Sequence, residues 1–531
     1  MLSKILSGGV VGVDGIPVTV EVDITKKGFG SFKIVGLAGK AVDESRERVF
    51  AALENTGIEF PKYRITVNLA PADVPKDGPT YDLPIAVGVL QASEKLPASL
   101  DLSQSMFFGE VSLDGSLNAT PAILPLTLLA KHQGIPNVYV PAINAQEAAI
   151  VDDVNIYPID NLSNLVLHLT GQKRIEPIKD YSFENRNVEE NETYSLLLED
   201  IKGQDYAKRA LIIAAAGGHN IIFTGPPGAG KTMMARVLPS LIPSLTKNEA
   251  ITVTKIYSIA HLIDPHTPLI ITRPFRAPHH TTSRVGLVGG GTQLSPGEIT
   301  LAHHGVLFLD EIPEFPRSVT ESLRQVMEDR TITITRAKGS VKFPASFMLV
   351  AASNPCPCGN YLSEKPCTCS QSKILNYQQR LSGPLLDRID IHSFVSAVDP
   401  RIILNPKDVT TTTGPNSASK TDSENSNPQN YSTKNAKQII ARARDIQNER
   451  FEKTNITVNA EMPASMISQF CHLSDELTEV LVTASNTLGF SARSIHKILK
   501  VARTIADINT EENIERPHLL EAIGYRKKNN S

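Results

Sequence analysis

The first part of the chain alternates short apolar runs with glycines and polar turns. Residues 18–22 are rich in valine and alternate like a β-strand, and residues 64–69 and 137–141 show the same pattern. Between residues 40 and 55 the apolar side chains instead recur at helical spacing. This mixture of strands and helices predicts a self-contained α+β domain over residues 1–170.

A different pattern occupies residues 194–399, where apolar runs alternate with longer amphipathic stretches. The runs at 221–224, 305–309 and 347–352 are dominated by apolar residues. Continuous apolar runs of this length are typical of parallel strands that are covered on both faces of a sheet. We therefore expect an α/β core in this part of the chain.

Two polar stretches separate the remaining parts. Charged residues dominate 171–193, which we interpret as a linker. Residues 405–434 consist largely of Thr, Ser, Asn, Pro and Lys, too few apolar side chains to offset the entropy of ordering, so a disordered insert is expected. After it, helical periodicity over 435–531 predicts an all-α lid domain. The chain of 531 residues is long enough for this multidomain organisation at about 150 residues per domain.

Composition and charge exclude several classes of protein. Apolar residues make up 41% and charged residues 21%, as in ordinary globular proteins. The formal net charge of −3 excludes a protein that coats nucleic acid by bulk positive charge, although it allows a local basic surface. No apolar run approaches about 18 residues, so we expect no membrane span. Glycines and an aspartate interrupt the apolar start before it resembles a signal peptide, which favours a cytoplasmic location.

A complete P-loop follows the apolar run at 221–224 and precedes a helical stretch. The glycines allow backbone N–H groups to surround phosphate oxygens, and the helix N-terminus adds its dipole. Lys231 is expected to reach the β- and γ-phosphates of ATP, and the Thr232 hydroxyl to bind Mg²⁺. The motif consists of Gly225, Pro226, Pro227, Gly228, Ala229, Gly230, Lys231 and Thr232.

Polar side chains also follow the other two apolar runs. Asp310 and Glu311 come directly after 305–309, and Asn354 follows 347–352. Ligands of doubly wound sheets bind at the carboxyl ends of the strands, so these side chains are expected beside the P-loop. Asp310 would hold Mg²⁺, Glu311 would orient the attacking water, and the Asn354 amide would position water or the γ-phosphate.

These strands and their polar ends resemble the AAA+ ATPases. The resemblance implies that Asn354 is sensor 1 and that Arg388, in the sequence LLDRID, is a finger acting on a neighbouring subunit's nucleotide. A finger acting in trans implies a homo-oligomer, in this superfamily normally a hexameric ring. Arg493 matches the sensor 2 position, just after Ser491, a good N-cap for a helix over 494–507. Whether Arg493 acts in cis or in trans stays open, as does a plain ion pair of Arg388 with a neighbouring aspartate.

Seven further segments make the resemblance more specific: 200–204, 209–210, 214–220, 273–283, 289–291, 296–298 and 354–359. Together they resemble the magnesium-chelatase-like ATPases of the YifB/ComM group over nearly the whole chain outside 405–434. This resemblance implies a hexameric DNA helicase that drives branch migration of recombination intermediates during natural transformation. An ATP-dependent protein remodeller or Lon-like protease, and a magnesium-chelatase-type motor subunit, are the alternatives.

A hairpin pattern occurs between the second and third apolar runs. Residues 331–336 and 341–343 alternate like strands, with a glycine in the turn between them. Arg336, Lys338 and Lys342 place positive charge near the tip, where basic side chains would bind DNA phosphates. The position resembles the pre-sensor 1 hairpin that lines the pore of related ring helicases. An ordinary solvated hairpin is the alternative.

The N-terminal domain resembles the Lon protease (S5-like) fold. Residues 75–80 fall where Lon proteases carry their catalytic serine motif, and Thr80 occupies the nucleophile position. The catalytic lysine is expected at 125–127, where the chain has Pro-Leu-Thr, and Lys131 comes too late. A hydroxyl without a base is a weak nucleophile, so we expect a proteolytically inactive domain that binds DNA or a partner, or shapes the ring.

The cysteines are unevenly placed. Cys356, Cys358, Cys367 and Cys369 form two C-x-C pairs, whereas Cys471 stands alone in an apolar helical context and is expected in the core. Four thiolates would form a closed tetrahedral Zn²⁺ site. The C-x-C spacing is tighter than usual for zinc, so reduced thiols on a loop remain the alternative.

Overall fold

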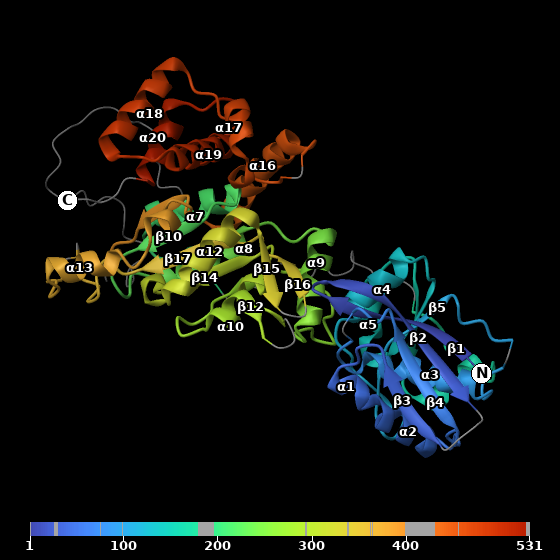
Figure 1. The fold of residues 1–531 in the computed structure, drawn as a ribbon. Helices are drawn as coiled ribbons and strands as arrows, with labels where there is room; N and C mark the ends of the chain where they lie inside the picture. The colour runs from blue at the N-terminus through green and yellow to red at the C-terminus, as the bar shows by residue number, and fades with distance from the viewer. Residues whose placement is uncertain are drawn as a thin grey trace.

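The computed structural model describes residues 2–25, 30–74, 76–97, 99–178, 196–291, 295–336, 339–361, 363, 365–398, 431–454 and 456–526. Figure 1 shows an N-terminal domain with its own sheet, a central domain built on a second sheet, and helices from the C-terminal part packed over the central domain. The expected α+β, α/β and all-α units are therefore all present along the described chain.

The N-terminal sheet is mixed. Its strand order is β3-β4-β2-β1-β5-β8-β9, and β1 pairs with β2, and β2 with β4, in antiparallel register, while the other neighbours are parallel. The strands predicted at 18–22, 64–69 and 137–141 lie within β2, β4 and β8. The bounds are β1 (Leu2–Val11), β2 (Asp14–Thr25), β3 (Ser31–Val35), β4 (Arg64–Ala70), β5 (Ser105–Phe107), β8 (Asn137–Pro141) and β9 (Asn155–Ile159), with the separate pair β6 (Glu110–Val111) and β7 (Leu117–Asn118).

Helices cover both faces of this sheet. Helices α2, α3 and α6 share one apolar cluster, and α4 and α5 share another on the opposite side. The single helix predicted over 40–55 is wrong in one respect, because the chain breaks at Glu44 into two helices. The bounds are α1 (Lys40–Asp43), α2 (Ser45–Asn55), η1 (Pro79–Tyr81), α3 (Asp82–Ala92), α4 (Ile123–His132), η2 (Ala142–Asn144), α5 (Ala145–Ala148) and α6 (Leu162–Leu169).

The central sheet is entirely parallel, with the order β11-β14-β17-β10-β18. The three predicted apolar strands are confirmed as β10, β14 and β17, and alternate residues face opposite apolar clusters: Ile221 and Phe223 face one, Ile222 the other. Burial on both faces explains the continuous apolar runs. The bounds are β10 (Ile221–Thr224), β11 (Phe275–Arg276), β14 (Val306–Leu309), β17 (Met348–Ser353) and β18 (Ile391–Phe394).

Helices and small strands enclose this sheet. One face packs against α7 and α8, and the other against α12 and the predicted hairpin, which is confirmed as β15 and β16. The remaining bounds are η4 (Leu198–Asp200), α7 (Asp205–Gly217), α8 (Lys231–Leu241), α9 (Lys247–Ile259), α10 (Arg284–Val288), β12 (Gly289–Gly290), β13 (Ser295–Pro296), α11 (Glu298–Leu301), η5 (Ile312–Glu314), α12 (Arg317–Asp329), β15 (Thr331–Arg336), β16 (Gly339–Pro344), α13 (Gln371–Gln378) and α14 (Gly383–Leu386).

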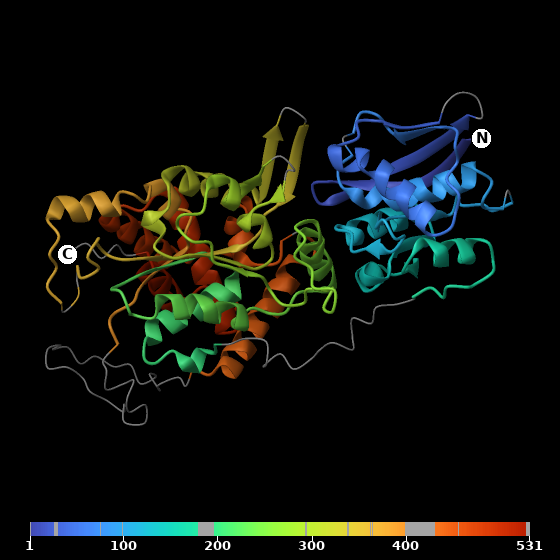
Figure 2. The same ribbon diagram turned by 90° about the horizontal axis from the view of Figure 1, so that it is seen from below.

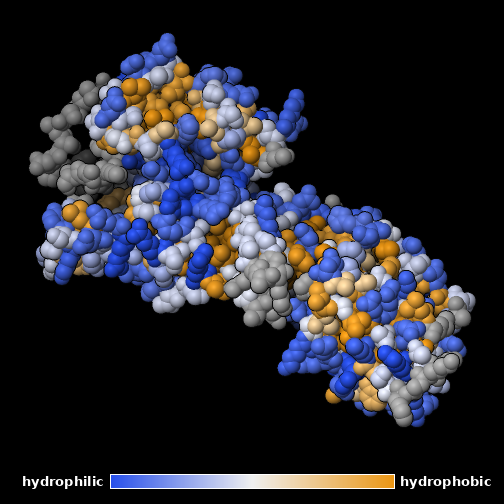
Figure 3. Space-filling model, viewed as in Figure 1, coloured by the Kyte–Doolittle hydropathy of each residue, from blue (hydrophilic) through white to orange (hydrophobic). Residues whose placement is uncertain are grey.

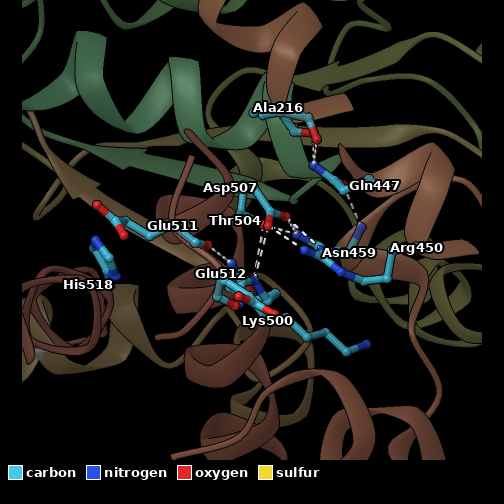
Figure 4. A network of polar contacts seen from close by, with 12 residues as sticks. Ala216, Gln447, Arg450, Asn459, Lys500, Thr504, Asp507, Glu511, Glu512 and His518 are labelled. Carbon is cyan, nitrogen blue, oxygen red and sulfur yellow. Dashed lines mark hydrogen bonds and ion pairs between the residues drawn. The ribbon is translucent and has the colours of Figure 1, made fainter. Parts of the chain in front are cut away.

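The C-terminal unit is helical and organised around a buried carboxylate. Asp507, fully buried, accepts hydrogen bonds from Arg450 at 2.5 and 2.8 Å, from Asn459 at 2.7 Å and from Arg503 at 3.0 Å (Figure 4). Shared donors offset the cost of burying its charge. The bounds are α16 (Thr433–Phe451), η6 (Asn459–Glu461), α17 (Ala464–Phe470), α18 (Asp475–Leu488), α19 (Ala492–Ile508) and α20 (Arg516–Gly524).

Two polar contacts fix the C-terminal helices to the central sheet. Lys497 on α19 forms an ion pair at 2.7 Å with the buried Asp390, which precedes β18. The buried His219, at the end of α7, hydrogen-bonds to Thr504 on α19 at 2.8 Å. Figure 3 shows hydrophilic side chains gathered along this junction on the face it displays. The lid is thus joined to the core through ionisable as well as apolar groups.

The N-terminal domain packs against α9 of the central domain. The buried Glu147 on α5 accepts a hydrogen bond from Ser258 at 2.5 Å, and Lys255 pairs with Asp14 at 2.7 Å. Leu245, Ala250, Val253 and Leu269 complete the apolar cluster of α4 and α5. In Figure 2 the hairpin of β15 and β16, in yellow, stands beside this domain. A side-chain carbon added to Gly12, in the β1–β2 turn, would lie 2.9 Å from Val341 of that hairpin.

Two predicted boundaries change. Residues 171–178 belong with the N-terminal domain, because Ile178 pairs with Ile156 of β9; residues 179–193 of the predicted linker lie outside the described part. The end of the predicted insert is wrong, because Ser432 caps α16 and Thr433 begins it; residues 405–430 lie outside the described part. Within the described residues, no helix is both long and apolar enough to cross a membrane.

Candidate ATPase site

The P-loop connects β10 to α8, as its sequence predicts. Gly228 and Gly230 adopt φ values of 79° and 89°, a left-handed conformation that side chains disfavour. Gly225 is required for a different reason: a side-chain carbon there would lie 2.0 Å from the backbone oxygen of Val395. The loop therefore presents its backbone at the N-terminus of an eleven-residue helix, where the dipole favours phosphate.

Lys231 lies inside this loop and is largely buried. Its ammonium group donates to the backbone oxygens of Gly225 at 2.6 Å and Pro226 at 2.9 Å, and to Oδ1 of Asn354 at 3.0 Å. Burial lowers the pKa of Lys231, and the nearby Asp310 and Glu311 carboxylates oppose that shift. These acceptors hold a cation at the place where phosphate oxygens would provide stronger partners.

The carboxyl end of β14 supplies the acidic residues. Oδ2 of Asp310 accepts a hydrogen bond from the Thr232 hydroxyl at 2.8 Å. The pair offers the oxygen ligands that Mg²⁺ prefers, so the residues fit this ion. Glu311 is exposed and adopts a left-handed φ of 49°, an uncommon conformation for a non-glycine residue that is often found at functional sites. The predicted residues of three separate strands are thus brought together at one edge of the sheet.

The arginines predicted as the finger and as sensor 2 share a partner. Arg388 pairs with Oε1 of Glu328 on α12 at 2.6 Å, and Arg493 approaches the same oxygen at 3.3 Å. Ser491 caps α19, as predicted, by accepting from the Ser494 N–H at 3.2 Å. Arg388 therefore forms its ion pair with Glu328, and not with an adjacent aspartate.

No motif in the sequence pointed to Glu328. It is one of several carboxylates on the amphipathic helix α12, 60 residues before Arg388. The packing of α12 beside α14 brings this carboxylate to Arg388, and Arg493 on α19 approaches it as well. The Arg388 side chain is 10% exposed and that of Arg493 is 58% exposed. Within the described chain, Nε of Arg388 has no hydrogen-bond partner.

Comparison with known proteins identifies the family. Three family models match: "Subunit ChlI of Mg-chelatase" over residues 20–144, "Magnesium chelatase, subunit ChlI" over 197–402, and its C-terminal model over 430–526. Competence protein ComM of Haemophilus influenzae is 42% identical over 99% of this chain and 97% of its own length. The chain belongs to the YifB/ComM family. YifB of Escherichia coli, described as uncharacterized, is 38% identical over 99% of this chain and 97% of its own length.

Membership of this magnesium-chelatase-like AAA+ family makes the chain an ATPase motor, with ATP and Mg²⁺ as its nucleotide and cofactor. A Lon protease of Mycoplasma mycoides is also similar, at 26% identity over 33% of this chain and 21% of its own length. That similarity covers only a small part of the protease.

Thr80, at the position of the protease nucleophile, is predicted to have no lysine as its base. Thr80 is buried in η1, and within the described residues no hydrogen bond joins its hydroxyl to a lysine. Thr127 donates to the backbone oxygen of Ile123 inside α4, and Lys131 pairs with Asp153 at 3.1 Å. The inactivity of this domain as a protease stays a prediction.

Two of the three basic residues predicted for DNA belong to the β15–β16 hairpin. Lys342 is exposed on β16, where it stands opposite Thr333. Arg336 ends β15, paired with Gly339, and Lys338 lies outside the described residues. The hairpin geometry is therefore confirmed, whereas DNA contact by these residues stays a prediction.

The four clustered cysteines come together in space. Their Sγ atoms all lie within 4.8 Å of one another. Cys356 is buried and the other three are partly exposed. Cys471 is 5% exposed within the apolar cluster that includes α16 and α19, so its predicted place in the core is confirmed.

Proposed function

We propose that this ATPase motor acts on DNA as a hexameric ring and promotes branch migration in homologous recombination or natural transformation. The observation that carries the proposal is the assembled hydrolysis centre of Lys231, Thr232, Asp310 and Asn354, in a chain that is similar over its whole length to a competence protein. We further propose a cytoplasmic location and Zn²⁺ at the four cysteines as a structural ion.

In the proposed cycle, Lys231 exchanges its backbone acceptors for the β- and γ-phosphates of ATP. Thr232 and Asp310 supply oxygen ligands for Mg²⁺, which neutralises charge on the phosphates when bound. Glu311, exposed at the carboxyl end of β14, orients and polarises the attacking water. Asn354, already within hydrogen-bond distance of Lys231, positions the attacking water or the γ-phosphate.

The proposed oligomer follows from the arginines. Arg388 and Arg493 gather at one carboxylate, Glu328, so we infer that both face the same subunit boundary and act on the neighbouring chain's nucleotide. In the assembled ring, the phosphates of the neighbouring chain's nucleotide would replace Glu328 as the partner of Arg388 and Arg493. A finger of this kind requires the next subunit, and a closed ring satisfies that requirement for every copy.

DNA contact would be local because the net charge is −3. Arg336 and Lys342 belong to the hairpin of β15 and β16, and Lys338 falls between these strands in the sequence. A ring would bring six such hairpins to one channel. Phosphate binding by these side chains would weaken steeply with salt, as counterion release demands.

The decisive experiment measures ATP turnover by the full chain with and without single-stranded, duplex and forked DNA, at two salt concentrations. We expect DNA to stimulate turnover. Lys231→Ala should abolish it by removing the phosphate-binding cation, and Glu311→Gln should lower it by about 10²- to 10⁴-fold by removing the base. Branch migration that persists in either variant would refute the motor mechanism.

The Lon similarity favours one alternative, an ATP-dependent protein remodeller or protease. That alternative predicts casein degradation that Thr80→Ala abolishes, whereas we expect none by the wild-type chain. A magnesium-chelatase-type motor instead predicts metal insertion into a porphyrin when partner subunits are added. Either activity, together with turnover that DNA does not change, would replace the proposal.

A further inference from the structure

The four clustered cysteines have the spacing of ligands around one metal ion. Cys356 Sγ lies 3.4 Å from Cys358 Sγ and 3.8 Å from Cys367 Sγ, and Cys358 Sγ lies 3.6 Å from Cys367 Sγ. Cys369 joins them within the 4.8 Å that encloses all four sulfur atoms. Tetrahedral zinc at about 2.3 Å from each sulfur requires sulfurs about 3.8 Å apart, close to these distances.

Other uses of four cysteines fit less well. A disulfide needs a sulfur–sulfur distance of about 2.05 Å, and all five cysteines are free. An iron–sulfur cluster places several iron and sulfide atoms between its ligands, so its cysteine sulfurs must lie farther apart than a single ion allows. Soft thiolates in a tetrahedron select zinc among the common divalent cations.

Backbone N–H groups of the same loop donate to the cysteine sulfur atoms. The Tyr361 N–H donates to Cys356 Sγ at 3.3 Å, and the N–H groups of Asn360 and Thr368 face Cys358. Donors of this kind orient metal-bound thiolates and stabilise their charge. The loop thus provides the outer contacts as well as the four ligands.

This loop also touches the ATPase site. Cys356 follows Asn354 by two residues, and Asn354 accepts the hydrogen bond from Lys231. A side-chain carbon added to Gly359 would lie 2.5 Å from Cδ of Pro227, so the cysteine loop packs directly on the P-loop. If the cysteine loop lost its fixed conformation, both Asn354 and the P-loop would lose a packing partner.

We propose that Cys356, Cys358, Cys367 and Cys369 bind one Zn²⁺, and that this ion holds the loop that positions Asn354 against the P-loop. The four sulfurs complete the tetrahedron and leave no position for a catalytic water, so the ion is structural. The second half of the inference rests on the proposed ATP hydrolysis, whereas the first half does not.

The metal is tested independently of activity. Elemental analysis of the full chain should find one zinc per chain, and substitution with Co²⁺ should give the visible absorption of a tetrahedral thiolate site. Cys367→Ser and Cys369→Ser should lose both signals, whereas Cys471→Ser, a buried cysteine remote in sequence, should keep both. Wild-type chain that neither retains zinc nor gives the cobalt spectrum would overturn the site.

The positioning role is tested by turnover. Cys369→Ser should lower kcat about 10- to 100-fold with a smaller change in KM, and Asn354→Ala should lower kcat in the same way. Cys369→His should restore both metal and turnover because imidazole is also a zinc ligand. Circular dichroism separates this loss from unfolding. A folded, zinc-free variant with full kcat would overturn the positioning role. Absence of ATP hydrolysis in the wild type would instead refute the proposed function and leave the metal result standing.

Discussion

At the scale of single residues, the catalytic centre depends on side chains that already bond to one another. Lys231 reaches Asn354 at 3.0 Å, and Thr232 reaches Asp310 at 2.8 Å, so three strands deliver their polar ends to one place. In the same way, Arg388 and Arg493 already form ion pairs with one side chain, that of Glu328. A single carboxylate between two arginines restrains both, and the charge of a neighbouring nucleotide could replace it.

If the arginines act in trans, defective subunits should complement one another. Arg388→Ala and Lys231→Ala should each lack turnover, because the finger contributes about 10³-fold or more. An equal mixture should recover about a quarter of the wild-type sites, since an intact P-loop then meets an intact arginine on its neighbour.

The same mixture with Arg493→Ala in place of Arg388→Ala decides how Arg493 acts. Recovery in this mixture indicates action in trans, as the shared Glu328 favours. No recovery in either mixture would contradict the proposed subunit boundary. Turnover is measured at subunit concentrations that keep the oligomer assembled, with each variant alone as its control.

At the scale of elements, α19 is joined to the central sheet by groups that titrate. Burial lowers the pKa of His219 to about 4, although Asp390 opposes that shift. Burial also disfavours the charge of Asp390, but Lys497 and His219 outweigh it and lower the pKa of Asp390 to about 2. The contact is therefore adapted to a neutral histidine and an ionised aspartate.

Stability should fall on acidification because of these groups. Between pH 6.5 and about 4 the unfolded chain protonates His219 and the folded chain does not, so this residue alone removes up to about 3 kcal/mol. The stabilisation from Asp390 is lost only below about pH 3.8. Thermal unfolding at pH 7 and pH 5 checks this, and His219→Gln should show a smaller difference. An equal difference in both proteins would contradict the assignment.

The β15–β16 hairpin is the element proposed to contact DNA. Lys342→Glu should lower DNA affinity and reduce the salt dependence of binding by about one ion per chain, while turnover without DNA stays unchanged. Lys62→Glu, an exposed lysine of the N-terminal domain, is the matched control. Fluorescence anisotropy with labelled DNA at several salt concentrations provides the measurement. Equal salt slopes for the two variants would exclude Lys342 from the contact.

At the scale of the whole molecule, the N-terminal domain is attached to α9 by one continuous interface. Glu147 meets Ser258, Asp14 meets Lys255, and the apolar cluster of α4 and α5 includes Val253. Because the same domain reaches Val341 through the β1–β2 turn, it contacts both the motor domain and its hairpin. Movement of the hairpin would therefore displace residues of the N-terminal domain that contact it.

A charge placed in this interface should separate the domains. Val253 is 1% exposed, so Val253→Asp would bury an unpaired carboxylate, and undocking avoids that cost. Small-angle X-ray scattering should report a larger radius of gyration. Asn248→Asp adds the same side chain at an exposed position of α9 and should leave the radius unchanged. A compact Val253→Asp protein would show that other contacts dominate.

The sequence alone determined those parts of the protein whose physics is local. The P-loop, the acidic pair after β14 and Asn354 are contiguous with the strands that place them, and continuous apolar runs predicted those strands. The Ser491 cap is local in the same way. The tertiary structure decided the rest: the start of α16 at Thr433, whose hydroxyl donates to Glu199, the shared Glu328 and the docking on α9. Those features depend on groups far apart in the chain, and only folding brings such groups into contact.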